Sequence, residues 1–272
     1  MKFGRQSIVL STHDAQFEAV AFKGDFEVNL AKIAGWGYEG VELAIRNPDL
    51  LDGNKLEEVL AAEGLLVPAI GTGQAWGEER LSFTNPDLVI RKAAIDRIKS
   101  QIEFAKRFNA LVIIGLIRGV TPWGQSKDQS IHLLIECLQD CLATASAQGI
   151  RMALEPLNRY ETDLLHTVEE GLELIHQVGS PNLGLLLDTF HMNIEESDMV
   201  DSILRADEHI FHFHVADSNR WYPGGGHLDF KTTLQALKST GYQGWISGEF
   251  MPVPDADAAA KQSISFLKRI IP

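Results

Sequence analysis

Short apolar runs alternate with amphipathic segments along the whole chain, and this alternation limits the fold more than any other feature. Eight runs of four or five residues are typical of buried strands, at 7–11, 40–43, 67–70, 111–115, 150–154, 183–187, 210–214 and 245–248. Eight segments with apolar residues at helical spacing lie between and after them, at 29–36, 55–63, 87–108, 129–148, 167–178, 199–206, 230–239 and 255–270. Gly64, Gly149, Gly179 and Gly241 stand where a left-handed residue would end a helix.

Strand and helix repeat without a long linker, which predicts an α/β protein with a parallel sheet. We expect the sheet to close into a (β/α)8 TIM barrel, with residues 1–272 forming a single domain, because such barrels commonly use about 250 residues. A doubly wound open sheet is the alternative. It usually has fewer strands, and no dinucleotide-type glycine motif follows the first strand here.

Charge and cysteine content narrow the class of partner and the compartment. The formal net charge of −13 opposes binding to nucleic acid or to an anionic membrane surface, so we expect neither. Cys137 and Cys141 are spaced four apart in a helical pattern and are interpreted as small buried hydrophobic residues, as in a reducing compartment. The apolar run near the N-terminus is too short for a signal peptide or membrane span, so we expect a cytoplasmic protein.

Ligand-type side chains close the last four predicted strands. Glu155, Asp188, His214 and Glu249 stand at these ends, separated by 33, 26 and 35 residues. Each spacing is close to one barrel unit of roughly 31 residues, so the four side chains should meet on the rim where functional groups of such barrels lie. Taken singly, each has a structural explanation: a solvated rim acid, an N-cap aspartate or a core histidine.

Three carboxylates that face one another in a partly dry cavity repel strongly unless a cation lies among them. Oxygen-rich ligation with one imidazole suits a hard or borderline divalent ion such as Mn²⁺, Mg²⁺ or Co²⁺, and suits Zn²⁺ less well. His212 lies two residues before His214 on the same side of its strand, deeper in the barrel. We expect it to fill a barrel layer or to hydrogen-bond a ligand carboxylate.

Four stretches resemble the ketose 3-epimerases, the D-tagatose/D-psicose 3-epimerase group of the xylose-isomerase-like barrel superfamily. They are LEPLNRYET (154–162), LDTFHMNIEE (187–196), HFHVADSNRWYPGGGHLDF (212–230) and GEF (248–250). The resemblance is strongest in the second half of the chain. It implies a metal set of Glu155, Asp188, His214 and Glu249, usually with Mn²⁺, and a homodimer or homotetramer. It also implies substrate contacts from Glu161, His191 and Arg220.

The chemistry that the resemblance implies is inversion at C3 of a free 2-ketose through an enediolate. Glu155 and Glu249 would exchange the C3 proton on opposite faces. His191 and Arg220 would stabilise the oxyanion at O2, and Glu161 would hold the O1 hydroxyl. Without the resemblance, Arg220 would be interpreted as a solvated loop residue, His191 as part of a turn, and Glu161 as the partner of Arg159 in a surface ion pair.

Aromatic residues after three strands offer apolar walls for a sugar pocket: Trp76, Trp123 and Trp221. The alternative is that these rings only hold the loops in place. Glu42 and Arg118, near the ends of the second and fourth strands, are candidates for contacts to the far end of the sugar.

Other functions use the same barrel, so the fold does not choose between them. They are a sugar-phosphate epimerase or isomerase, hydroxypyruvate isomerase, and an inosose dehydratase or keto-glycoside lyase. GTG (71–73) and PGGGH (223–227) offer backbone amides that suit a phosphate. A DNA-repair endonuclease is disfavoured by the acidic balance and by too few histidines for a trinuclear zinc site. A binding barrel without activity is disfavoured by the intact ligand set.

Overall fold

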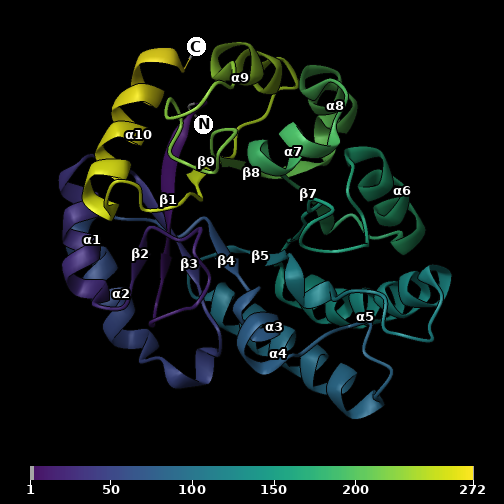
Figure 1. Cartoon of the computed structure of the whole chain (residues 1–272). Coiled ribbons are helices and arrows are strands. Elements are labelled where there is room, and N and C mark those ends of the chain that lie inside the picture. The colour runs from purple at the N-terminus through teal and green to yellow at the C-terminus, as the bar shows by residue number, and fades with distance from the viewer. Residues whose placement is uncertain (1–2, 272) are drawn as a thin grey trace.

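The computed structural model describes residues 3–271 and confirms the predicted closed parallel barrel. The strand order is β2-β1-β3-β4-β5-β6-β7-β8-β9, and a further pairing of β1 with β9 closes the sheet. Figure 1 shows the strands at the centre and the helices around them. The strands are β1 (Arg5–Ser11), β2 (Phe22–Lys23), β3 (Gly40–Ala44), β4 (Ala69–Gly71), β5 (Leu111–Ile114), β6 (Met152–Leu154), β7 (Leu183–Asp188), β8 (Ile210–Val215) and β9 (Trp245–Gly248).

The eight predicted helical segments are all helices, with boundaries that shift by at most three residues. They are α1 (Phe26–Gly35), α2 (Gly53–Glu63), α4 (Leu88–Lys106), α5 (Lys127–Gln148), α6 (Val168–Val178), α8 (Met199–Ala206), α9 (Phe230–Ser239) and α10 (Ala256–Ile270). Gly64, Gly149 and Gly179 end α2, α5 and α6 in the left-handed conformation, as predicted. Ser126 and Thr167 begin α5 and α6 with capping boxes.

Besides three short 3-10 helices (Pro48–Leu50, Leu116–Arg118 and Asp207–His209), the structure adds one strand and two α-helices that the apolar pattern does not predict. The two-residue β2 pairs with Leu10 and Ser11 of β1, beyond the part of β1 that pairs with β9. Helix α3 (Gln74–Glu79) follows β4, and α7 (Thr189–Glu195) begins directly at the end of β7. These pieces are too short to show a helical or strand period, and all three lie at the end of the barrel where the strands finish.

Side chains of the strands alternate between the barrel interior and the layer under the helices. On β5, Val112 and Ile114 belong to the main core, whereas Leu111 and Ile113 belong to a separate small cluster inside the barrel. That inner cluster also contains Ala69, Ala153 and Leu186. The barrel is therefore filled below its rim, and the polar side chains of Glu42 and His212 are also buried. Cys137 and Cys141 are buried free thiols, as expected.

Candidate metal and substrate site

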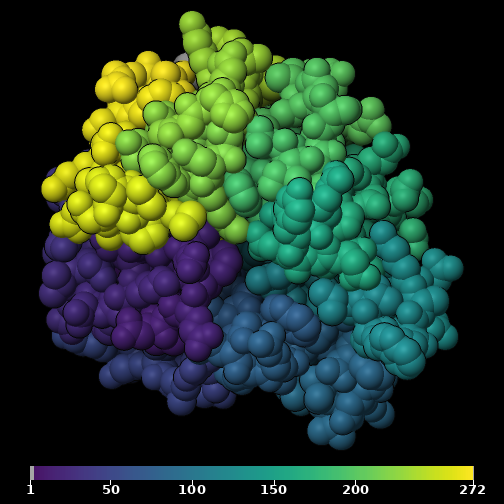
Figure 2. Space-filling model, viewed as in Figure 1, coloured from purple at the N-terminus to yellow at the C-terminus, as the bar shows by residue number. Residues whose placement is uncertain are grey.

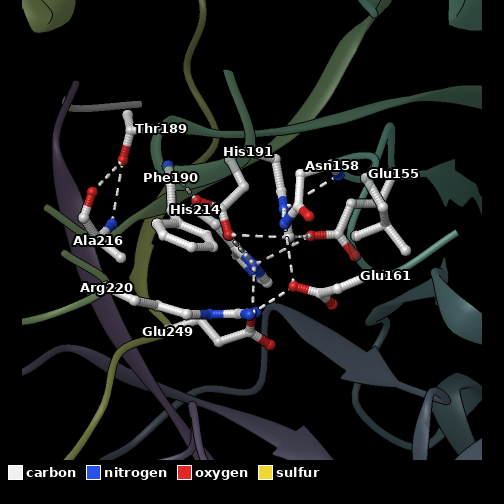
Figure 3. Close-up of polar contacts among 12 residues, drawn as sticks. Glu155, Asn158, Glu161, Thr189, Phe190, His191, His214, Ala216, Arg220 and Glu249 are labelled. Carbon is white, nitrogen blue, oxygen red and sulfur yellow. Dashed lines mark hydrogen bonds and ion pairs between the residues drawn. The ribbon is translucent and has the colours of Figure 1, made fainter. Parts of the chain in front are cut away.

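The four predicted ligand residues meet at one rim of the barrel. Glu155 follows β6, Asp188 ends β7, His214 lies in β8, and Glu249 follows β9. One ligand atom from each lies within 4.8 Å of the others. Figure 3 shows Glu155, His214 and Glu249 turned toward a common point. Successive parallel strands thus deliver one side chain each to the same place, as the spacing predicts.

The imidazole of His214 lies near the three carboxylates without a hydrogen bond to them. Its Nδ1 atom is 3.8 Å from Glu155 Oε1, 4.0 Å from Asp188 Oδ2 and 3.8 Å from Glu249 Oε2. Glu155 Oε1, Asp188 Oδ2 and His214 Nδ1 are buried atoms without a hydrogen-bond partner in the structure. Buried polar atoms are rarely left unpaired, so three that surround one point indicate a ligand that pairs with all of them.

Glu42 on β3 fixes which nitrogen of His214 faces this point. Its two carboxylate oxygens lie 3.1 and 3.0 Å from His214 Nε2, and Oε2 also lies 2.7 Å from His212 Nε2. A carboxylate accepts, so Nε2 of His214 carries a proton and Nδ1 is left to offer its lone pair when the ring is neutral. A carboxylate behind the distal nitrogen is the usual arrangement for a metal-binding histidine.

Burial makes the charge of this cluster costly without a cation. It raises the pKa of Glu155 well above the ordinary value, and the charge of Glu249 adds to this effect. Burial also raises the pKa of Asp188, and raises that of Glu249 to about 7. For His214 burial alone would lower the pKa, but the charge and hydrogen bonds of Glu42 outweigh it and raise the pKa to about 10.

The donor set fits a divalent cation. Three carboxylates and one imidazole nitrogen are a hard to borderline ligand set. Cys137 and Cys141 lie in α5 and do not belong to the cluster. Gly115, at the end of β5, leaves room for the cluster, because a Cβ atom there would lie 2.9 Å from Glu155 Oε2. A second group, Glu42 with His212 and His214, also meets the geometric condition, but its atoms already pair with one another.

His191, in α7, presents a neutral imidazole to the same point. Its Nδ1 accepts from the backbone N–H of Asn158 at 3.3 Å, so the proton of the neutral ring is on Nε2. Nε2 lies 3.9 Å from both Glu155 Oε1 and Asp188 Oδ2 and has no hydrogen-bond partner. Burial, with the charges of Arg220 and Arg118, holds the pKa of His191 well below its usual range. The ring is therefore a hydrogen-bond donor that carries no charge.

Arg220 and Glu161 form the outer edge of the site (Figure 3). Arg220 Nη1 donates to Glu161 Oε1 at 2.6 Å, and its Nη2 lies 3.5 Å from Glu249 Oε2. The rings of Phe17 and Phe190 flank the guanidinium, with centroids 5.2 and 4.7 Å from its carbon. The pairing of Glu161 with Arg159 is ruled out, because Arg159 binds Glu195 instead.

A cavity of about 270 Å³ opens above the cluster and is lined by Glu155, Glu161, His191, Arg220 and Glu249. The surface is hollowed near the middle of the face in Figure 2, where the two halves of the chain meet. Much of the remaining wall is apolar or glycine: Val9, Phe17, Val20, Ala44, Gly71, Gly73, Gly77, Ile113, Gly115, Leu116 and Leu157. A few convergent polar groups in an apolar cavity are typical of a small-molecule site.

The three predicted pocket tryptophans lie apart from one another. Trp76 lines a shallower hollow together with Phe17, Glu161 and Arg220 at the mouth of the site. Trp123 is fully exposed, and Trp221 is 37% exposed. Neither of these two is among the residues that line the cavity, so the structure brings only Trp76 to the site.

Three residues of the site have roles that the sequence did not predict. Glu42 lines the cavity, but it is held by two histidines. Arg118 is fully buried and donates to the backbone oxygen atoms of Glu155 and Leu165, so it supports the ligand loop from outside the cavity. Asn158 contacts both His191 and Glu161. A buried arginine and an asparagine in a loop give no periodic signal in one sequence.

Fold and site define a parallel (β/α)8 barrel with a carboxylate–histidine cluster on its functional rim. The chain belongs to the xylose isomerase-like TIM barrel family, which it matches over residues 30–270. It is 32% identical to the L-ribulose 3-epimerase of Methylomonas sp. (strain DH-1) over 85% of this chain and 82% of that protein. Hydroxypyruvate isomerase of Escherichia coli (strain K12) is 26% identical over 87% of this chain and 92% of that protein.

A solved structure of the D-allulose 3-epimerase from Methylomonas sp., in complex with D-allulose, superposes with a TM-score of 0.84. It is 25% identical, and the match covers 98% of this chain and 97% of that chain. The predicted resemblance to ketose 3-epimerases, which are enzymes of the isomerase class, is thus confirmed. Among the described residues, no helix is both long and apolar enough to cross a membrane.

Proposed function

We propose that the protein is a metal-dependent epimerase that inverts C3 of a free 2-ketose. One observation carries the proposal: four side chains, three of them buried and Glu249 half-buried, converge on a point where three of their atoms lack a partner. The epimerases named above supply the substrate class. Glu155, Asp188, His214 and Glu249 would hold the cation, with Mn²⁺ the best match and Mg²⁺ or Co²⁺ the alternatives. When bound, such an ion withdraws electrons from the ketose oxygens and so acidifies the C3 hydrogen.

Glu155 and Glu249 are the proposed acid and base. They come from β6 and β9, which flank β7 and β8, so the two carboxylates approach the cavity from separate sides. One glutamate would remove the C3 proton to give an enediolate, and the other would return a proton to the opposite face. Without a cation, burial raises the pKa of both carboxyl groups above the ordinary glutamate value. A bound cation would oppose this shift and favour the ionised form that can remove a proton.

The remaining polar groups would bind and orient the sugar. The neutral Nε2–H of His191 and the guanidinium of Arg220, which line the cavity, would donate to the oxygen on C2 as negative charge develops there. Glu161, fixed by Arg220 and Asn158, would accept from the O1 hydroxyl. Trp76 would cover the mouth of the cavity.

The charges of the cavity favour a free sugar over a phosphorylated one. Arg220 is the one lysine or arginine among the described residues that line it, and it already faces Glu161 and Glu249. Glu78, on the opposite wall, adds a carboxylate. A phosphate dianion would meet acidic groups without a free cation to pair with. The glycine-rich GTG stretch lies on this wall, but it brings no basic side chain with it.

Isotope exchange tests the reaction and separates it from its closest rival. The protein is loaded with Mn²⁺ and incubated in D₂O with D-fructose, D-tagatose, L-ribulose and their phosphate esters. We expect deuterium at C3 of a free ketose together with its C3 epimer. Deuterium at C1 would instead indicate an aldose–ketose isomerase, for which the similarity to hydroxypyruvate isomerase is the supporting observation. Turnover that survives complete chelation would contradict the metal role.

Two further expectations are part of the proposal and have separate tests. A homodimer or homotetramer would give a mass of two or four times 30.1 kDa in light scattering. A cytoplasmic protein without nucleic-acid or membrane partners would stay in the soluble fraction of a cell lysate, free of nucleic acid.

A further inference from the structure

The cavity wall opposite the carboxylate cluster contains a buried amide that the proposed reaction does not use. Gln74 begins α3, directly after β4, and it lines the cavity. In the closed sheet β4 lies opposite β8, with three strands between them on each side. Gln74 is therefore across the barrel from His214, where the end of a sugar far from its reacting carbon would lie. Its side chain is buried, with 6% exposed.

The orientation of this amide is set by a chain of hydrogen bonds. Ser11 Oγ donates to the backbone oxygen of His13 at 2.7 Å. Its only proton is then used, so it accepts from Gln74 Nε2, at 2.8 Å. The amide oxygen of Gln74 is thereby turned away from Ser11, and Oε1 is buried without a partner. An acceptor left in this state costs free energy that a donor from a ligand would recover.

Glu78, one helical turn further along α3, sets the charge of the same wall. Its carboxylate lines the cavity and is held by His13 at 3.3 Å and by Arg46 at 2.8 Å. Apolar residues and glycines surround the two polar groups. The wall therefore offers one unpaired acceptor and one carboxylate whose cationic partner, Arg46, does not line the cavity, which suits a neutral hydroxyl donor and opposes an anion.

We propose that Gln74 is a specificity-determining residue that accepts a hydrogen bond from the terminal hydroxyl of the ketose, at the end far from C3. Glu78 disfavours substrates that carry an anionic group in place of that hydroxyl. This inference rests on the proposed function, because it takes the reacting carbon to lie at the carboxylate cluster.

The test compares D-psicose with 6-deoxy-D-psicose in the Mn²⁺-loaded enzyme. We expect wild-type kcat/KM to favour D-psicose by about tenfold, because only the 6-hydroxyl pairs with Oε1. In Gln74→Met, which keeps the side-chain length, kcat/KM for D-psicose should fall by about tenfold and that for the deoxy sugar should hold, since only the hydrogen bond is lost. Glu79→Gln is the matched control, because Glu79 lies on the same helix but outside the cavity lining and should keep the wild-type ratio.

Two further variants test the parts of the inference. Ser11→Ala frees the amide to rotate, so the preference for the 6-hydroxyl should shrink; an unchanged ratio would contradict the orientation derived above. Glu78→Gln should raise the relative kcat/KM for D-psicose 6-phosphate severalfold, and no rise would contradict the charge role of Glu78.

The outcomes separate this inference from the proposed function. An active wild type with equal ratios in wild type and Gln74→Met would overturn the role of Gln74 alone. A wild type that epimerises no ketose would overturn both. Thermal melts that match wild type confirm that each variant is folded.

Discussion

The two halves of the barrel rim do different work with the same architecture. Strands β6 to β9 end in ligand-type side chains whose free atoms meet at one point. Strands β1, β3, β4 and β5 instead contribute the wall of the cavity, with small or apolar residues such as Ala44, Gly71 and Ile113. Under the proposed function, one half would hold the reacting end of the sugar, and the other half would determine which groups the rest of the sugar can carry.

The largest effect is expected in the second half. Glu249→Gln keeps the shape of the side chain but removes its charge and its ability to carry the proton. Deuterium exchange at C3 should fall by about 10³-fold, as for the loss of a general acid or base. Mass spectrometry of the recovered sugar measures the rate. Glu169→Gln, an exposed carboxylate elsewhere in this half, should exchange at the wild-type rate. Full exchange in Glu249→Gln would remove that residue from the mechanism.

The charge of the cluster predicts a stability that depends on pH only when the metal is absent. Burial raises the folded-state pKa of Glu155, Asp188 and Glu249, so the folded protein binds more protons than the unfolded chain above about pH 4.5. His191 and His212 act in the opposite direction below about pH 6.5, because burial keeps them neutral in the folded protein while the unfolded chain binds a proton there. The metal-free protein should therefore lose stability as pH rises from 6.5 to 8, by about 3 kcal/mol or 6–12 °C in Tm. His214, whose pKa is raised to about 10, acts in the same direction, because its contribution is lost at high pH.

Scanning calorimetry at pH 6.5 and pH 8, with Mn²⁺ and with a chelator, measures this dependence. The loaded protein should not lose stability over the interval, because the cation keeps the carboxylates ionised at both values. A chelated protein that is equally stable at pH 6.5 and pH 8 would contradict the assigned pKa shifts.

Glu42 links the two halves of the rim. It comes from β3 in the first half, yet its carboxylate accepts a hydrogen bond from His214, a predicted metal ligand of the second half. Glu42→Gln weakens the acceptor that fixes the imidazole, so Mn²⁺ affinity should fall by about 10–100-fold. Isothermal titration measures the Kd directly, without reference to activity. Glu39→Gln, which alters a half-exposed carboxylate close by in sequence, should bind Mn²⁺ as wild type does. An unaltered Kd in Glu42→Gln would confine metal binding to the second half.

The smallest effect is expected on the outer side of the first half. Arg97 pairs with Glu79 through two hydrogen bonds, behind the cavity wall. Arg97→Gln should cost about 1 kcal/mol or less, so Tm should move by at most about 2–4 °C. C3 exchange should not change, because neither partner lines the cavity. A large fall in activity would show that the ion pairs of the first half position the wall more strongly than we infer.

The sequence predicts the second half of the site better than the first. Glu155, Asp188, His214 and Glu249 were predictable because each directly follows or ends an apolar run, and the runs recur at the length of one barrel unit. Helix α3 was not predictable, since six residues are too few to show a period. The partners of Glu42, Gln74 and Arg118 come from strands and loops far along the chain. Such pairs are set by tertiary packing, which one sequence does not display.

The positions of functional residues in loops are harder still to predict from the sequence. Trp123 and Trp221 follow strands in the same way as Trp76, yet only Trp76 lies at the site, because the path of a loop is not fixed by the strand before it. The interpretation of Glu161 as a partner of Arg159 failed for the same reason. Arg159 instead donates to Glu195 at the end of α7, and Glu161 accepts from Arg220.

Arg118 links the segment after β5 to the segment after β6. It lies in the first of these segments, and its guanidinium donates to the backbone oxygen atoms of Glu155 and Leu165 in the second. An engineer who wishes to transplant the β6 connection into another barrel would have to move residues 116–165 as one block. An insertion or deletion in the segment around Arg118, or around Leu165, would be expected to shift Glu155, although Glu155 lies in neither altered segment. Among residues 3–271, no side chain of α3 hydrogen-bonds to Glu155, Asp188, His214 or Glu249, so the α3 connection would be the better place to test a redesign of substrate choice.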